Sequence, residues 1–393
     1  MSNALELDPQ RVLPADADAV LLGRVWLPEC AGPAVVAVRG GELFDVTTSM
    51  APTVRDVLES PDPKGLLDDT RGRSIGGIAE VLANSDEKAR DPQRPWLLSP
   101  VDLQAVKAAG VTFAASMLER VIEEQAKGEP QRAADLRREI VGMIGTELVE
   151  LVPGSPAAMS LKQTLIKRGL WSQYLEVGIG PDAEIFTKAQ PLSSVGIGAH
   201  VGIHPASRWN NPEPEVAVLL ASDGRMVGAT LANDVNLRDF EGRSALLLGK
   251  AKDNNASCAI GPFIRLFDQR WGVEDLQHVE VSVRVDGSDG FRLDGTSSMA
   301  QISRSPAALA QATLNENHQY PDGVVLLLGT LFAPVQDRGE AGSGFTHHAD
   351  DVVGISAPEL GCLSNRVRTS DRCAPWTFGA GALMRNLAAR GVL

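Results

Sequence analysis

The chain has 393 residues, of which 44% are hydrophobic and 22% are charged, and its formal net charge is −13 at pH 7. Such values are ordinary for a soluble globular chain with a sizeable core, and the acidic balance argues against nucleic-acid binding through a broad basic surface. The N-terminal stretch is acidic and lacks an apolar core, so no signal or transit peptide is expected, and no apolar run approaches the ~20 residues that span a bilayer. Four cysteines without a C-x-x-C pair predict reduced thiols in a cytoplasmic protein.

Strand and helix patterns alternate along the chain. Residues 18–60 contain short apolar runs punctuated by Gly and Pro, which predict strands. The polar, proline-bearing stretch 86–100 predicts a junction, so we expect a small N-terminal β-rich domain over residues 1–95. Residues 101–150 carry apolar residues at helical spacing and predict helices, whereas short strands and turns are expected from about 180 to 370. The expected fold class is therefore α+β, with a mostly β core in the C-terminal half.

A hairpin with acidic ends is predicted in the stretch "PEPEVAVLLASDGRMVGATLANDVNLRDF", residues 212–240. Two apolar runs flank the turn sequence "ASDGR" and read as paired strands. Glu213 and Glu215 are two positions apart, so in an extended segment they point to the same side, and Asp234 follows the returning strand. Three carboxylates at one end of a hairpin are either solvated strand ends or ligands of a hard divalent cation such as Mg²⁺.

Two lysines follow the hairpin, within the apolar and small-residue stretch "LLLGKAKDNNASCAIGPFI". Lys250 and Lys252 are either surface side chains that extend outward or groups beside a cation. In the second case they would serve in proton transfer or pair with an anionic substrate. The spacing alone leaves both interpretations open.

Four segments in this order, "PEPEVAVLL", "VGATLANDVNLRD", "KDNNASCAIGP" and "PDGVVLLLGT", resemble the signature of the fumarylacetoacetate hydrolase superfamily. That signature has paired Glu residues, an N-D before an R-D, a lysine before a G-P, and a G-T that closes a late strand. All four features occur within residues 213–330. The resemblance implies a mixed, mostly β roll in a catalytic domain of residues 96–393, with residues 113–150 as a helical lid segment.

The resemblance also implies a metal site. It assigns Mg²⁺, or Mn²⁺, to Glu213, Glu215 and Asp234. It places Lys252 beside the metal, because this lysine has the family's spacing before the G-P pair, and it leaves Lys250 at the surface.

Substrate-binding positions are implied in the same way. Arg238 matches a family arginine near the substrate, and Gly329 and Thr330 match the pair that holds a substrate carboxylate. The family resemblance further implies a homodimer or homotetramer.

The chain departs from the carbon–carbon hydrolases of the family at the base that activates water. Those members show G-x-N-Y-x-x-H-x-x-E, whose histidine acts on the attacking water. The corresponding segment here is "GVTFAASMLE", residues 110–119, in which Ser116 stands for the histidine and Glu119 keeps the acid. Because a serine titrates far too high to act as this base unaided, a reaction that expels water is favoured. Ser116 is then expected at the substrate.

The spellings "NNPEPE" and "AKDNNASCAIGP" are most similar to the 2-keto-3-deoxy-pentonate dehydratase branch. The resemblance implies conversion of 2-keto-3-deoxy-D-pentonate to 2,5-dioxopentanoate and water in non-phosphorylative pentose catabolism. Chelation of Mg²⁺ by a 2-oxo acid makes the C3 protons more acidic, and we expect Lys252 and Glu119 to share the proton transfers. Three alternatives stay open: a 2,4-diketo acid hydrolase of the same superfamily, an oxaloacetate-type decarboxylase, and a sugar-acid-binding protein without catalysis.

Overall fold

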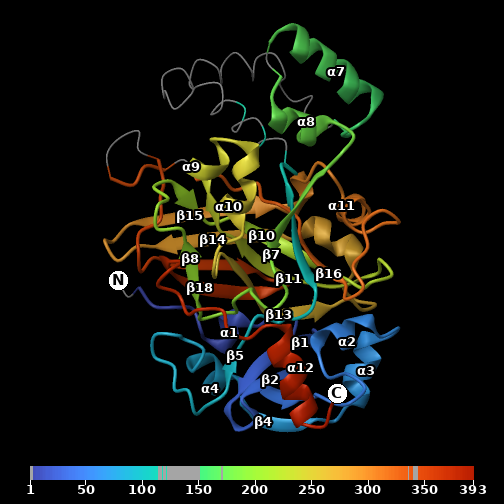
Figure 1. Cartoon of the computed structure of the whole chain (residues 1–393), viewed down its shortest axis with the longest axis vertical. Helices are drawn as coiled ribbons and strands as arrows, with labels where there is room; N and C mark the ends of the chain where they lie inside the picture. The colour runs from blue at the N-terminus through green and yellow to red at the C-terminus, as the bar shows by residue number, and fades with distance from the viewer. Residues whose placement is uncertain are drawn as a thin grey trace.

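Two β-sheets packed face to face form the centre of the protein in this computed structural model (Figure 1). The structure describes residues 3–113, 117, 121, 151–169, 171–334, 336–339 and 344–393. Ser116, Glu119 and most of the expected lid segment lie outside the described residues. No helix in the described part of the chain is both long enough and apolar enough to cross a membrane.

The larger sheet has 11 strands within the described residues, in the order β4-β3-β2-β1-β13-β11-β10-β16-β6-β7, with β5 paired to β1. Its strands are β1 (Leu21–Leu27), β2 (Gly32–Arg39), β3 (Glu42–Asp45), β4 (Arg73–Gly77), β5 (Trp96–Leu97), β6 (Ala105–Gly110), β7 (Glu184–Ala189), β10 (Pro214–Leu220), β11 (Met226–Asp234), β13 (Cys258–Leu266) and β16 (Val324–Leu327). Strand β16 pairs with β6 in parallel, whereas the hairpin strands β10 and β11 pair antiparallel, as the sequence predicts.

The smaller sheet has five strands, counted over the same residues, in the order β15-β14-β17-β18-β8. They are β8 (His200–Ile203), β14 (Glu280–Asp286), β15 (Arg292–Ser298), β17 (Val352–Ala357) and β18 (Gly361–Thr369). Strand β9 (Asn210–Asn211), which precedes β10, and strand β12 (Asn236–Leu237), which follows β11, form a two-stranded ladder that pairs residue 211 with residue 236.

Strand β10 is buried on both faces, which explains its unbroken apolar sequence. Val216, Val218 and Leu220 join the core between the two sheets, together with residues of β14, β17 and β18. Ala217 and Leu219, which alternate with them, join a second core on the other face. The period of two along β10 thus assigns each side chain to one of two cores.

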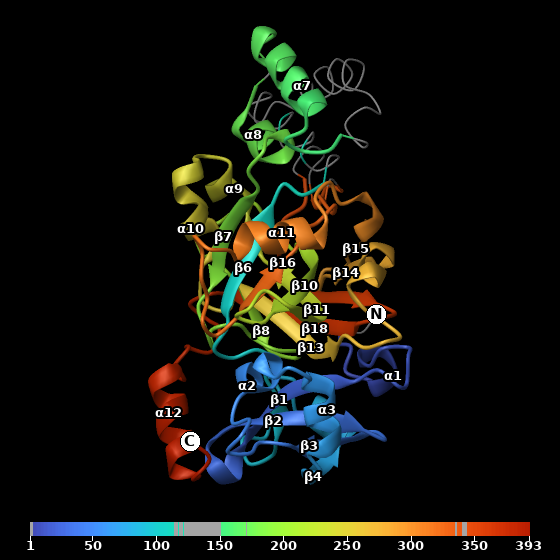
Figure 2. The same cartoon turned by 90° about the vertical axis from the view of Figure 1, so that its right-hand side faces the viewer.

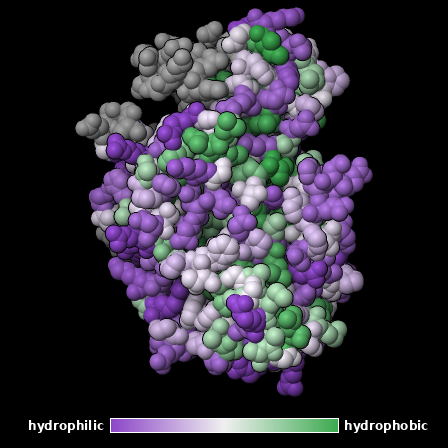
Figure 3. All heavy atoms as spheres, in the orientation of Figure 1, coloured by the Kyte–Doolittle hydropathy of each residue, from purple (hydrophilic) through white to green (hydrophobic). Residues whose placement is uncertain are grey.

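The N-terminal strands continue the larger sheet, because β1 pairs antiparallel with β13. Figures 1 and 2 show these strands at the end of the molecule that also holds the C-terminal helix α12 (Ala380–Ala389). Asn386 of α12 donates to the carbonyl oxygen of Cys30 at 2.7 Å. On the face drawn in Figure 3, polar side chains predominate and paler, more apolar ones gather around α12. The division into domains at residues 95 and 96 stays a prediction.

Short helices occupy the remaining chain and mostly begin at sequence-encoded caps. Thr53 and Asp56, for example, form a capping box at the start of α2. The helices of the described residues are α1 (Pro9–Val12), α2 (Val54–Glu59), α3 (Pro63–Asp69), α4 (Ile78–Ala83), α7 (Pro156–Lys167), α8 (Gln173–Ile179), α9 (Arg238–Glu241), α10 (Leu248–Lys252), α11 (Pro306–Thr313) and α12, with 3₁₀ turns at Pro28–Cys30, Ala245–Leu247, Val273–His278 and Met299–Gln301. Helices α7 and α8 project beyond the sheets (Figure 2).

The helix predicted for residues 101–150 is wrong in its first residues, which form a strand. Residues 101–150 predict helix throughout, but Ala105–Gly110 forms strand β6 between β16 and β7. The run "AVKAAG" is rich in good helix formers, yet two neighbouring strands offer its backbone a complete set of ladder partners. Tertiary context therefore overrides the local propensity.

Candidate active site

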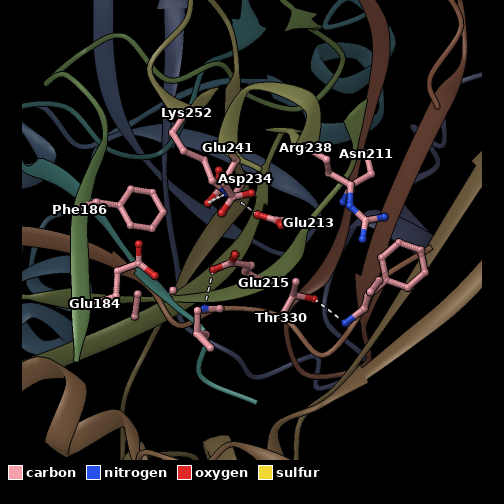
Figure 4. A pocket seen from close by; sticks show the side chains of 16 residues that line it. Glu184, Phe186, Asn211, Glu213, Glu215, Asp234, Arg238, Glu241, Lys252 and Thr330 are labelled. Carbon is pink, nitrogen blue, oxygen red and sulfur yellow. Dashed lines mark hydrogen bonds and ion pairs between the residues drawn. The ribbon is translucent and has the colours of Figure 1, made fainter. Parts of the chain in front are cut away.

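The hairpin of β10 and β11 brings the three predicted carboxylates together. Its strands pair from Pro214 opposite Asn233, and the Asp234 N–H donates to the Glu213 carbonyl oxygen at 3.0 Å. One carboxylate oxygen of each of Glu213, Glu215 and Asp234 lies within 4.8 Å of the others, and all three residues are buried. Figure 4 shows the three groups facing one another at the centre of a pocket. We call these three groups the carboxylate cluster.

The carboxylate cluster has the chemistry of a cation site. Burial, reinforced by the charges of Asp234 and Glu213, raises the pKa of Glu215 well above its ordinary value. The three buried carboxylates therefore repel one another, and a metal ion between them would relieve this repulsion. A ligand set made only of oxygen atoms fits Mg²⁺ or Mn²⁺, so the residues present fit the metal that the resemblance implies.

Lys252 ends α10 and reaches the same cluster. Its Nζ donates to Glu213 Oε2 and, at 3.0 Å, to Asp234 Oδ2. Burial acts to lower the pKa of Lys252, but the charges of Asp234 and Glu213 outweigh this effect and raise the pKa. Lys250 is exposed, and its Nζ lies 5.1 Å from the centre of the Phe240 ring. The structure thus separates the two lysines that the spacing alone left equivalent.

A second buried lysine, Lys188 of β7, contacts the cluster. It is fully buried, and its Nζ lies 2.7 Å from Asp234 Oδ1. The same Nζ donates to the carbonyl oxygens of Val235 at 2.9 Å and Lys252 at 2.7 Å. Lys188 therefore ties a cluster carboxylate to the backbone of Lys252. The sequence interpretation missed it.

Two further pocket residues, Glu184 and Phe186, lie on the same strand as Lys188. The three positions are two residues apart, so their side chains share one face of the strand. Figure 4 places both on one side of the carboxylate cluster. The Lys252 Nζ lies 5.4 Å from the centre of the Phe186 ring. The pocket thus has a carboxylate, Glu184, across from the clustered ones. The alternation in "EIFTKA" puts Glu184, Phe186 and Lys188 on one face of a strand, and this is the sequence signal that could have pointed to Glu184. The alternation does not reveal that this face is turned toward the carboxylate cluster.

Arg238 lies on the opposite side of the cluster from Glu184 (Figure 4). It begins α9 immediately after β12 and lines the pocket. Its guanidinium carbon lies 4.6 Å from the centre of the Trp209 ring, and Nη1 donates to the Pro334 carbonyl oxygen at 3.4 Å. The predicted arginine is therefore in the pocket and held by a cation–π contact.

Gly329 and Thr330 line the same pocket. The Gly329 N–H donates to Glu215 Oε2 at 2.6 Å, so this donor orients a carboxylate of the cluster. The Thr330 hydroxyl accepts the N–H of Phe332 at 3.1 Å and can still donate to a ligand. A Cβ at residue 329 would lie 2.0 Å from the Thr112 hydroxyl oxygen, and φ is +88° there, which explains the glycine.

His347 and His348, in the sequence "HHADD" of residues 347–351, lie in an ion network with Asp351 and Asp289. Asp351 accepts from Arg338 Nη1 at 2.6 Å and lies 3.1 Å from His347 Nδ1. Burial acts to raise the pKa of Asp351, but the hydrogen bonds of His347 and Arg338 outweigh it and lower the pKa to about 2. The network anchors residues 336–339, which follow the Gly329-Thr330 segment in the chain.

Sequence comparisons find one matching protein family and relatives that are named as sugar-acid dehydratases. Residues 175–368 match the family described as fumarylacetoacetate (FAA) hydrolase C-terminal. A 2-dehydro-3-deoxy-D-arabinonate dehydratase of Saccharolobus solfataricus is 30% identical over 185 residues, which are 47% of this chain and 58% of that protein. A probable 2-keto-3-deoxyxylonate dehydratase of Haloferax volcanii is 28% identical over 270 residues, which are 69% of this chain and 74% of that protein. The chain thus matches little more than half the length of the Saccharolobus enzyme.

Solved structures agree on the fold. A structure of 2-keto-3-deoxy-D-arabinonate dehydratase complexed with magnesium and 2,5-dioxopentanoate aligns at a TM-score of 0.62 and 20% identity, over 89% of this chain and 99% of that one. A hexagonal crystal form of 2-keto-3-deoxyarabinonate dehydratase gives a TM-score of 0.63 with the same identity and coverage. The family match covers the carboxylate cluster, Lys252 and the Gly329-Thr330 pair. About half of the chain, residues 175–368, is thus similar to the fumarylacetoacetate hydrolase family.

Proposed function

We propose that the protein is a Mg²⁺-dependent hydro-lyase that converts 2-keto-3-deoxy-D-pentonate (2-dehydro-3-deoxy-D-arabinonate) to 2,5-dioxopentanoate and water. The observation that carries this proposal is one pocket in which the carboxylate cluster meets Lys252 on one side and Glu184 on another. Two relatives named as dehydratases of such acids support the substrate class.

The carboxylate cluster would hold the metal. Once bound, Mg²⁺ would supply Lewis acidity toward the carboxylate and ketone oxygens of the 2-oxo acid, which makes the C3 protons easier to remove. Glu215 is held for this task by the Gly329 N–H, and Asp234 by Lys188. Mn²⁺ would suit the same oxygen ligands.

Two groups in the pocket have the capacity for the proton transfers. A lysine ammonium has three donors, and Glu213 and Asp234 accept two of those of Lys252, which leaves the third for a leaving C4 hydroxyl. Glu184 supplies a carboxylate that can accept the C3 proton. Glu119, to which the resemblance gives a share of this role, lies outside the described residues, and its part stays a prediction.

Carboxylate recognition is proposed at the Gly329-Thr330 end. Because the Gly329 N–H is taken by Glu215, the Thr330 hydroxyl is the more available donor for the substrate carboxylate. Phe186 lines the pocket beside Lys252, where its ring would limit the access of water to a bound substrate. Arg238 completes the cationic part of the pocket.

The histidine positions favour elimination over the hydrolytic alternative. All six histidines lie in the described part of the chain, and none of them lines the pocket. A 2,4-diketo acid hydrolase of this family would need such a base for the attacking water.

The test is a direct assay. Chelator-treated protein is incubated with 2-keto-3-deoxy-D-pentonate with and without Mg²⁺, and 2,5-dioxopentanoate is measured with a coupled semialdehyde dehydrogenase. Magnesium-dependent semialdehyde is the expected result. Pyruvate released from a 2,4-diketo acid, without semialdehyde from the pentonate, would show that the protein is the hydrolase instead. Carbon dioxide released from oxaloacetate would indicate the decarboxylase.

A further inference from the structure

Asn211 presents a buried amide oxygen to the pocket. The residue is 2% exposed, it lines the pocket, and its Oδ1 has no hydrogen-bond partner among the described residues. Its Nδ2 donates to the Pro212 carbonyl oxygen at 2.9 Å. Only the NH₂ group of an amide can donate to a carbonyl, so this bond fixes which side of the amide carries the oxygen. Within the described part of the chain the oxygen is therefore an acceptor without a donor, which is costly in a buried position.

The ladder of β9 and β12 holds this amide in place. Residue 211 pairs with Asn236, and the neighbouring Asn210 is fixed on both sides: its Oδ1 accepts the His347 N–H at 3.2 Å, and its Nδ2 donates to Ser207 Oγ at 3.2 Å. Asn236 also has an unpartnered buried Oδ1, but it does not line the pocket as the described residues define it. Asn211 thus combines a fixed, unpaired acceptor with access to a ligand.

We infer that Asn211 accepts a hydrogen bond from the C5 hydroxyl of the sugar acid and makes the enzyme select 5-hydroxylated 2-oxo acids. This inference rests on the proposed function. The carboxylate and the ketone of the substrate have no donor to offer an amide oxygen. The C4 hydroxyl leaves as water and must receive a proton, which an acceptor cannot give. The C5 hydroxyl is the remaining donor.

The neighbour of Asn211 strengthens this assignment. Figure 4 shows Asn211 beside Arg238, on the side of the carboxylate cluster opposite Glu184 and Phe186. A hydroxyl both donates and accepts, so an amide oxygen next to a guanidinium offers it one partner of each kind. A carboxylate at this position would gain from Arg238 but would be repelled by the amide oxygen. The pair is therefore matched to an alcohol.

Paired substrates test the inference. The wild type and Asn211→Leu are assayed, with Mg²⁺, on 2-keto-3-deoxy-D-pentonate and on its 5-deoxy analogue, and loss of the C4 proton signal is followed by NMR for both. We expect the wild type to prefer the hydroxylated acid in kcat/KM by about 100-fold or more, because a polar site rejects an analogue that leaves its acceptor unpaired. Asn211→Leu should reduce this preference to about threefold or less, mainly through KM for the hydroxylated acid.

Further variants keep the result decisive. Asn211→Asp retains an oxygen acceptor and should retain the preference for the hydroxylated acid. Asn211→Ala also removes the acceptor, and it is assayed in place of Asn211→Leu if the leucine variant does not fold. Thr330→Val, which alters the proposed carboxylate end, should slow both substrates by a similar factor and leave the preference unchanged. Calorimetric Mn²⁺ binding equal to that of the wild type shows that the metal site of Asn211→Leu is intact.

The outcomes separate the inference from the function on which it rests. If the wild type turns over the pentonate but Asn211→Leu loses the same factor on both substrates, Asn211 does not read the C5 hydroxyl and the inference is wrong. If the wild type turns over neither substrate, the proposed function fails and the inference falls with it. A wild type without preference for the hydroxylated acid also overturns the inference while the function stands.

Discussion

Lys188 Nζ lies 2.7 Å from Asp234 Oδ1, and both side chains are almost completely buried. The lysine is on β7 and the aspartate ends β11, so the contact joins two strands that are not neighbours in the larger sheet. Because the same ammonium binds the carbonyl oxygen of Lys252, it fixes a proposed metal ligand and a proposed catalytic residue relative to each other.

Removal of this lysine should therefore weaken both folding and metal binding. In Lys188→Met, the buried Asp234 loses one of its two ammonium partners, and breaking a buried ion pair typically costs about 3–5 kcal/mol. We expect urea unfolding to show a loss of this size and calorimetry to show weaker Mn²⁺ binding. Lys107→Met is the control, since Lys107 donates to the Thr187 hydroxyl at 2.8 Å, lies 5.4 Å from the centre of the Tyr320 ring and does not line the pocket. Similar losses in both variants would contradict the role of Lys188.

The two lysines near the end of α10 should differ sharply in their effect on turnover. Lys252→Met removes the ammonium beside the carboxylate cluster, and kcat should fall by about 100-fold or more, as for loss of a general acid or base. Lys250→Met changes an exposed side chain and should leave kcat near the wild-type value. Near-normal turnover by Lys252→Met would remove Lys252 from the mechanism.

Substitutions of Glu215 and Glu184 should distinguish a metal ligand from a residue that transfers protons. Magnesium at 100 times its Kd should stabilise the wild type by about 2.7 kcal/mol, because the metal binds the folded chain. Glu215→Gln should lose most of this gain in thermal unfolding. Glu184→Gln should keep it and lose turnover, because Glu184 lines the pocket outside the carboxylate cluster. Loss of the magnesium effect in Glu184→Gln would instead indicate a metal ligand.

A methyl group at residue 329 should disturb the metal site. The Cβ of Gly329→Ala would lie 2.0 Å from the Thr112 hydroxyl oxygen, so the backbone must shift and the N–H bond to Glu215 should weaken. We expect lower Mn²⁺ affinity by calorimetry. Gly290→Ala is a matched control, since residue 290 has a similar φ of +84° and open space around its Cβ. Equal changes in Mn²⁺ affinity would mean that backbone strain alone, and not the contact with Thr112, is responsible.

Asp351 should make the folded chain sensitive to acid. Its pKa is lowered from 3.8 to about 2 in the folded state, so the stability contributed by the ionised form is present above pH 4 and is lost as the pH falls through 2. Asp351→Asn lacks this group. The difference in free energy of unfolding between wild type and variant should therefore shrink by about 2 kcal/mol from pH 5 to pH 2.

The control for this pH series is Asp294→Asn, which removes an exposed ion pair with Arg284. Its effect on stability should stay below about 1 kcal/mol at every pH. A difference for Asp351→Asn that stays constant between pH 5 and pH 2 would show that Asp351 is not ionised preferentially in the folded chain.

Local sequence was sufficient for the carboxylate cluster and its hairpin. Glu213 and Glu215 share a face because the strand period is two, and the turn sequence returns Asp234 to the same end. The family signature then selected Lys252 over Lys250, and the structure separates these two lysines in the same way. These features are short-range or follow from a spacing, so they are readable without coordinates.

Only the tertiary structure decided which distant residues complete the pocket. Lys188 reaches Asp234, and Glu184 faces the cluster, because β7 is the edge strand of the larger sheet and pairs with β6. The sequence of β6 by itself favours a helix, so this pairing could not be predicted locally. Asn211 became visible as an unpaired acceptor only once the partners of its amide were known. Hydrogen-bond satisfaction and burial depend on contacts between residues far apart in the sequence, and no local pattern of residues encodes them.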